Sequence, residues 1–213
     1  VYQMRRTNIE NHKYEITDIA HETYPFLHRI RALRDIGSEV KAGDLGGFVE
    51  AEWNLSYEDS DSWIFDDAIA ANCAYVCEGA CLRKQAIACG NSSLRKGAVL
   101  SGHARVEDTA CISGGLVTGY ARVSSRGMVN SYEEKSPVIT GESIVLGMVT
   151  GNVRVTGEAV ILGDEKIFND AIDRLILTEK GRSIERDPAR DELVPQSARA
   201  ERSKKPKVRG QSR

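Results

Sequence analysis

Residues 62–112 read SWIFDD-AIAANC-AYVCEG-ACLRKQ-AIACGN-SSLRKG-AVLSGH-ARVEDT-ACI. In this grouping the first residue of each hexad is alanine or serine, and the third is aliphatic. Residues two apart on a β-strand point to the same side, so we expect both positions to face a common interior and the residue between them to face outward. A period of six does not match the 3.6 residues of an α-helical turn.

A corner is expected after each short strand. Two positions before the small residue the chain often carries Gly, Asn or Asp, which tolerate the backbone angles of tight turns. These residues are Asp66, Asn72, Gly90, Gly102, Asp108 and Gly114. Three strand-and-corner units close a triangular coil of about 18 residues, and successive coils stack strand on strand. The sequence therefore predicts an all-β fold, a parallel β-helix of hexapeptide repeats.

The repeat extends in both directions from this stretch. Earlier rungs are predicted at residues 47–49 and 53–55. Later, one residue is lost between Val117 and Ala121, and the period then resumes. The polar stretch 130–136 breaks the pattern, and we interpret it as a loop extruded from a corner.

Caps are expected because a solenoid exposes strand edges at its ends. Residues 14–19 and 26–33 alternate as strands do, which predicts a β-hairpin on the first coil. The resulting division is an N-terminal hairpin cap at 1–39, a β-helix at 40–178 whose last strand is 174–178, and a disordered basic tail at 179–213. The tail is predicted because apolar residues thin out from about Arg182.

Composition limits the partners and the compartment. The 213 residues carry a net charge of −2, so no global field favours nucleic acid or membranes. Nucleic acid is conceivable only at the basic tail, where Lys204, Lys205, Lys207 and Arg209 are candidate partner-binding residues. No apolar run approaches the ~20 residues that span a bilayer. Five cysteines without a secretory signal favour the reducing cytoplasm of a bacterial cell.

Three segments carry a family resemblance: VKAGDLGGFV at 40–49, NLS at 54–56 and SWIFDDA at 62–68. Together they resemble the start of the repeats in the YdcK-like hexapeptide-repeat family of enterobacteria and their phages. The resemblance covers roughly Tyr14 to Leu177 and leaves out the basic tail. It implies a left-handed β-helix in a bacterial or phage-infected cytoplasm. Members are described as transferases, but a fold does not fix a function.

His103 is the candidate catalytic residue, since it is the one histidine within the repeats. Hexapeptide acyltransferases use a histidine as general base, and an exposed imidazole could take a proton from a hydroxyl or amine substrate. The simpler interpretation is a corner residue without a catalytic role, because only Glu107 and Asp108 are near enough in sequence to orient it. One repeat histidine cannot supply the three ligands of a carbonic-anhydrase zinc site, and we expect no metal.

The cysteines do not stack on one another. Cys73, Cys77, Cys81, Cys89 and Cys111 fall on different edges and faces, and no two are about one coil apart. We therefore expect surface thiols rather than a zinc site or a disulfide.

Outward positions on one face form an apolar stripe. Trp63, Cys81, Val99 and Val117 are each one coil apart. Exposed apolar stripes usually mark an interface, so we expect self-association, most simply a homotrimer. The alternative is that a cap segment or the C-terminal strand covers the stripe.

Two functions follow from these features. The first is a β-helix scaffold or interaction protein, phage- or prophage-associated, that binds a host or phage protein through its faces, loop or tail and needs no cofactor. The second is an acyltransferase that binds acyl-CoA between subunits and uses His103 as base. Whether the protein is an enzyme is left open by the sequence.

Overall fold

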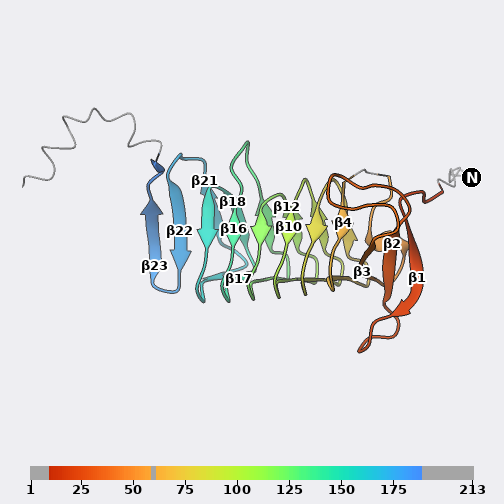
Figure 1. Cartoon of the computed structure of the whole chain (residues 1–213). Coiled ribbons are helices and arrows are strands. Elements are labelled where there is room, and N and C mark those ends of the chain that lie inside the picture. The colour runs from red at the N-terminus through yellow and green to blue at the C-terminus, as the bar shows by residue number, and fades with distance from the viewer. Residues whose placement is uncertain (1–9, 59–60, 189–213) are drawn as a thin grey trace, which may run out of the picture.

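Short strands joined by tight turns make up the chain in the computed structural model, which describes residues 10–58 and 61–188. Within these ranges the strands form three sheets, and a single turn of 3-10 helix, η1 (Glu52–Asn54), follows β3. The sheets run along a single rod with an antiparallel hairpin at each end (Figure 1). The predicted all-β parallel β-helix is therefore confirmed.

Each sheet takes one strand per coil, except that the six-stranded sheet has none from the first coil and that the strands of the end hairpins extend the other two sheets. The nine-stranded sheet consists of β1 (Tyr14–Ala20), β2 (His28–Ala32), β3 (Leu45–Val49), β5 (Ile69–Ala70), β8 (Ile87–Ala88), β11 (Arg105–Val106), β14 (Arg122–Val123), β17 (Ile144–Val145) and β20 (Val160–Ile161). The eight-stranded sheet consists of β4 (Trp63–Ile64), β7 (Cys81–Leu82), β10 (Val99–Leu100), β13 (Leu116–Val117), β16 (Val138–Ile139), β19 (Val153–Val155), β22 (Arg174–Thr178) and β23 (Gly181–Glu185). The six-stranded sheet consists of β6 (Tyr75–Val76), β9 (Ser93–Arg95), β12 (Cys111–Ser113), β15 (Met128–Asn130), β18 (Met148–Gly151) and β21 (Lys166–Asn169).

The register of the repeats is the predicted one between residues 62 and 112. Trp63 pairs with Cys81 and Cys81 with Val99, a step of 18 residues per coil. Every small and every aliphatic residue of the hexads is at most 1% exposed. The interior is therefore a narrow column of alanine, serine and aliphatic side chains.

The corners have left-handed backbone angles at six-residue intervals. Positive φ occurs at Asp66, Asn72, Glu78, Lys84, Gly90, Lys96, Gly102, Asp108 and Gly114, which include all six predicted corner residues. Two aspartates also bond to the next coil: Asp66 Oδ2 accepts the backbone N–H of Lys84 at 2.9 Å, and Asp108 Oδ2 accepts that of Ser125 at 2.8 Å. Short polar side chains thus stabilise a conformation that is otherwise strained.

The residue missing from one coil is missing at a different place from the one predicted. Val99 pairs with Leu116, so the step is 17 residues and the loss falls before Leu116 rather than after Val117. Val117 is consequently paired with Leu100 and fully buried. The extruded loop is confirmed: β15 ends at Asn130, and Tyr132 and Lys135 bridge within the loop before β16 begins.

The predicted N-terminal hairpin is confirmed as β1 and β2, and β2 also pairs antiparallel with β3. Of the rung predicted at 53–55, Leu55 forms an isolated parallel bridge with Val76, whereas Trp53 and Asn54 belong to η1. The buried side chain of Asn54 adds to this pairing, since its Nδ2 donates to the carbonyl oxygens of Asn72 and Ala74 in the next coil at 3.0 and 2.9 Å.

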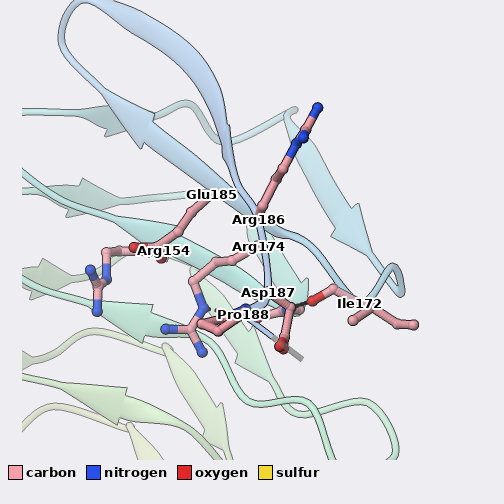
Figure 2. Close-up of a pocket in the computed structure, with 8 residues that line it drawn as sticks. Arg154, Ile172, Arg174, Glu185, Arg186, Asp187 and Pro188 are labelled. Atoms are coloured by element: carbon pink, nitrogen blue, oxygen red, sulfur yellow. Dashed lines mark hydrogen bonds between the residues drawn. The ribbon is translucent and has the colours of Figure 1, made fainter. Parts of the chain in front are cut away.

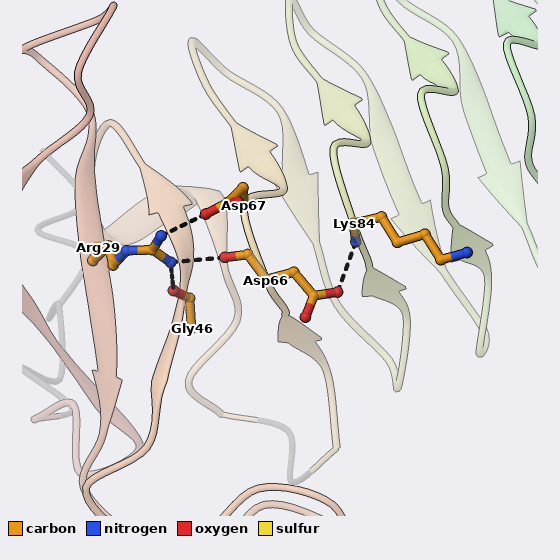
Figure 3. A network of polar contacts seen from close by, with 5 residues as sticks. All are labelled: Arg29, Gly46, Asp66, Asp67 and Lys84. Atoms are coloured by element: carbon orange, nitrogen blue, oxygen red, sulfur yellow. Dashed lines mark hydrogen bonds and ion pairs between the residues drawn. The ribbon is translucent and has the colours of Figure 1, made fainter.

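Arg29 of β2 fastens this cap to the first coils (Figure 3). Its Nη1 donates to the carbonyl oxygens of Gly46 at 2.9 Å and Asp66 at 2.8 Å, and its Nη2 pairs with Asp67 Oδ1 at 2.5 Å. The guanidinium also lies over the ring of Phe48, 4.3 Å from its centroid. A planar cation with five donors suits this junction, because it serves three acceptors and an aromatic face at once.

The C-terminal end also has a hairpin. β22 pairs parallel with β19 as a last rung, and β23 returns antiparallel along it. The prediction of disorder from residue 179 is therefore wrong for Gly181–Glu185, although all five residues are exposed. Lys204, Lys205, Lys207 and Arg209 of the candidate tail lie outside the described residues.

Candidate functional site

The predicted apolar stripe is present in altered form. Cys81 and Val99 are half-buried outward residues, as expected. Trp63 is also at an outward position, in register with Cys81, but it is only 1% exposed because the cap covers it, with its ring edge-on against Tyr14 at 6.3 Å between centroids. The outward placement of Val117 is wrong. Val117 faces the core because the shortened coil brings Leu116 into the outward position.

The surface that remains is a column of four half-buried apolar side chains on the eight-stranded sheet. It consists of Cys81, Val99, Leu116 and Val138, each paired in register with the next. We call these four residues the apolar column. The cap thus covers only the N-terminal end of the predicted stripe.

A hollow of about 210 Å³ lies at the N-terminal end of the apolar column. Its walls include the cap loop from Ile36 to Val40 and the side chains of Phe65 and Arg83. Arg83 Nη2 bonds both carboxylate oxygens of Glu39, at 2.8 and 2.9 Å, and its guanidinium stacks 3.9 Å from the centroid of Phe65. The hydrogen bond from Arg83 lowers the pKa of the Glu39 carboxyl, so Glu39 stays ionised and paired with Arg83 at neutral pH.

A larger hollow of about 500 Å³ lies at the other end of the apolar column, beside Val138. Residues 134–136 of the extruded loop form one wall. Lys135 Nζ donates to the carbonyl oxygen of Asp170, and the ring of Tyr132 meets that of Phe168 edge-on at 5.2 Å. The loop is therefore attached to the last coil.

His103 is exposed at a corner, as expected. Its ring stacks on Tyr120 of the next coil, with 4.8 Å between centroids and 8° between planes. The two carboxylates near it in sequence are engaged elsewhere: Glu107 pairs with Arg122, and Asp108 accepts a backbone N–H from Ser125. The structure thus gives His103 an aromatic neighbour and does not bring either of these carboxylates to it.

None of the five cysteines forms a disulfide. Within the described ranges no three His, Cys, Asp or Glu side chains gather closely enough to hold a metal ion. No helix in these ranges is long and apolar enough to cross a membrane.

Two arginines that sequence reasoning passed over lie at the C-terminal end of the eight-stranded sheet. Arg154 and Arg174 line one hollow, although they belong to different coils. The alternation of Val153, Arg154 and Val155 marks Arg154 as an outward residue, but the sequence does not reveal what would lie beside it.

Comparison with known proteins gives no relative: no family model matches the chain, and no curated protein matches it.

Proposed function

We propose that this protein is a β-helix scaffold that works by binding another protein, and that the apolar column is its contact surface. The partner is an α-helix with one apolar face, lying along the rod. Following the resemblance to the YdcK-like family, we further propose a phage- or prophage-associated role in the bacterial cytoplasm.

The spacing of the apolar column supports a helical partner. Adjacent strands of a sheet lie about 4.7–4.9 Å apart, so the four side chains recur at that interval. A helix presents one face at alternating steps of three and four residues, which averages about 5.2 Å along its axis at a rise of 1.5 Å per residue. An extended chain presents one side only about every 6.6 Å. The helix is the better match over four rungs.

The ends of the column support the same conclusion. Hollows of about 210 and 500 Å³ adjoin its two ends and offer room for larger side chains of a partner. The cap loop and the extruded loop form walls of these hollows. A rod-shaped partner fits between such walls more readily than a flat surface does, which favours a helix over a second copy of this chain.

A photo-crosslinking amino acid in place of Val99 tests the proposal, with the full chain exposed to host-cell lysate. We expect crosslinks to a single partner peptide with an apolar helical face. Leu116→Arg should abolish them, because it puts a charge on the column. Ser93→Arg is the matched control, since Ser93 is a half-buried outward residue of the six-stranded sheet.

Crosslinks that survive Leu116→Arg would contradict the proposal. So would crosslinks confined to second copies of this chain, which would instead make the column a surface for self-association.

A further inference from the structure

A second hollow at the C-terminal end, of about 350 Å³, is lined by Arg154 of β19 and Arg174 of β22 (Figure 2). Glu185 and Asp187 also line it, and the side chain of Arg186 points away from the two other arginines. Arg154 follows Val138 in the register of the same sheet. The hollow adjoins the one of about 500 Å³ beside Val138, since both are lined by Asn152, Ile172, Arg174 and Asp187.

Arg154 has a buried donor without an acceptor. Its Nε is inaccessible to solvent and makes no hydrogen bond within residues 10–58 and 61–188. The backbone on either side is fixed, since Val153 and Val155 are fully buried and β19 pairs with strands on both edges. Buried guanidinium N–H groups are ordinarily hydrogen-bonded, so the described part of the chain leaves Arg154 incompletely satisfied, and a ligand would meet its Nη groups rather than the enclosed Nε.

Arg174 is held in place by an asparagine. Its Nε donates to Asn152 Oδ1 at 2.9 Å, and Asn152 Nδ2 donates to the carbonyl oxygen of Ile172 at 2.7 Å. Asn169 Nδ2 bonds the backbone oxygen of Asn152 at 2.7 Å and completes the support. This network occupies only the Nε of Arg174, and within the described ranges no hydrogen bond or ion pair involves its two Nη groups, which can therefore serve a ligand.

Neither arginine is neutralised by the chain itself in the described part. Ion pairs there join other residues, and none includes Arg154 or Arg174. Two positioned guanidinium groups offer the forked donors that match the oxygens of phosphate or carboxylate.

We propose that this hollow is a binding site for a small oxyanion, a phosphate or carboxylate group, gripped by Arg154 and Arg174. The carboxylate of Glu185, which also lines the hollow, would accept a hydrogen bond from a hydroxyl group of the same ligand. The ligand class is therefore a compact oxyanion. The proposal rests on Arg154 and Arg174 and does not require the protein partner proposed above, although the hollow adjoins the C-terminal end of the apolar column.

Calorimetric titration of the full chain, at low ionic strength, tests the site with two probes, inorganic phosphate and citrate. Saturable binding is expected for at least one of them. Arg154→Gln and Arg174→Gln should each weaken it about tenfold or more, because each removes charge-assisted hydrogen bonds. Arg126→Gln is the control, since Arg126 is an exposed corner arginine outside the hollow.

Each outcome is informative. Binding of phosphate alone assigns a phosphate group, binding of citrate alone assigns a carboxylate, and binding of both assigns shared oxyanion recognition. Absence of saturable heat with either probe overturns the site, as does equal weakening by Arg126→Gln. If Arg154→Gln fails to fold, Arg154→Lys retains the charge and still loses the fork, so weaker binding by a folded Arg154→Lys carries the test.

Discussion

Asn54 offers the sharpest test of how the first coil is held. Its side chain is fully buried in η1 and makes four hydrogen bonds. Oδ1 accepts the backbone N–H groups of Glu50 and Ala51 at 3.1 and 2.9 Å, and Nδ2 donates to the carbonyls of Asn72 and Ala74. Asn54→Ala removes all four hydrogen bonds but keeps the backbone groups that took part in them.

The loss in the free energy of unfolding depends on which backbone groups lose their only hydrogen-bond partner. The carbonyl of Asn72 keeps the indole N–H of Trp53 at 2.8 Å, and the exposed Glu50 can turn its N–H to water. Ala51 is only half-buried, whereas the carbonyl of the fully buried Ala74 has no such substitute. An unsatisfied buried group costs about 1–3 kcal/mol, so we expect a loss of about 2 kcal/mol. Typical domains have only about 5–15 kcal/mol of stability.

Tryptophan fluorescence in urea is the suitable measurement. The chain has two tryptophans, Trp53 and Trp63, and both belong to the first coil, so their emission reports on the site of the substitution. Circular dichroism reports the whole rod, which should change less because coils stabilise mainly their neighbours. The control is Asn130→Ala, at a half-buried outward asparagine of β15, which should stay within about 0.5 kcal/mol of wild type. A loss below about 1 kcal/mol for Asn54→Ala would refute the reasoning.

Four further predictions concern other parts of the rod. Ala104→Glu should prevent folding, since an unpaired buried charge costs several kcal/mol, and an unchanged melting curve would contradict the register. Gly141→Ala should lower the melting temperature more than Gly97→Ala: both glycines have φ near +70°, but a Cβ on Gly141 would lie 2.7 Å from a backbone oxygen of the next coil, whereas the other meets nothing within 4 Å. Val99→Arg should leave the melting temperature unchanged and dissociate any homotrimer formed through the column; light scattering that finds a monomeric wild type would instead exclude self-association. We expect no acyl transfer by the wild type, and calorimetric binding of acetyl-CoA, with transfer abolished by His103→Ala, would reverse that expectation.

The repeats could be read from the sequence because a strand fixes which residues point inward. Ala98 and Leu100 are buried, like the small and the aliphatic residue of every other hexad, because both point inward from one strand. This could be predicted without knowing how the coils pack. The position of the missing residue near Leu116 was predicted wrongly because the corner there is shortened by two glycines, Gly114 and Gly115, with φ of +83° and +91°. The presence of glycine in the sequence does not reveal that a corner is shortened in this way. β23 was missed because it is held by backbone pairing to β22 and buries almost nothing, so composition carries no sign of it.

The candidate site was less accessible to sequence reasoning. The exposed corner position of His103 follows from the period and is confirmed. The neighbourhood of Arg154 does not follow, because Arg154 pairs with Ile176 across a coil of 22 residues rather than 18. The turn that lengthens this coil determines that Arg174 reaches the same hollow, and turn lengths are outside what a six-residue period encodes.

Unequal coils have a practical consequence for engineering this rod. Leu116 and Val138 remain directly opposite each other although 22 residues separate them. The surplus is carried by the extruded loop, whose tip at Glu133 is exposed, and the paired strands on either side keep their register. Foreign sequence inserted at this tip should therefore be displayed beside the sheets without disturbing them. An epitope or fluorophore tag placed there would label the molecule at a known coil.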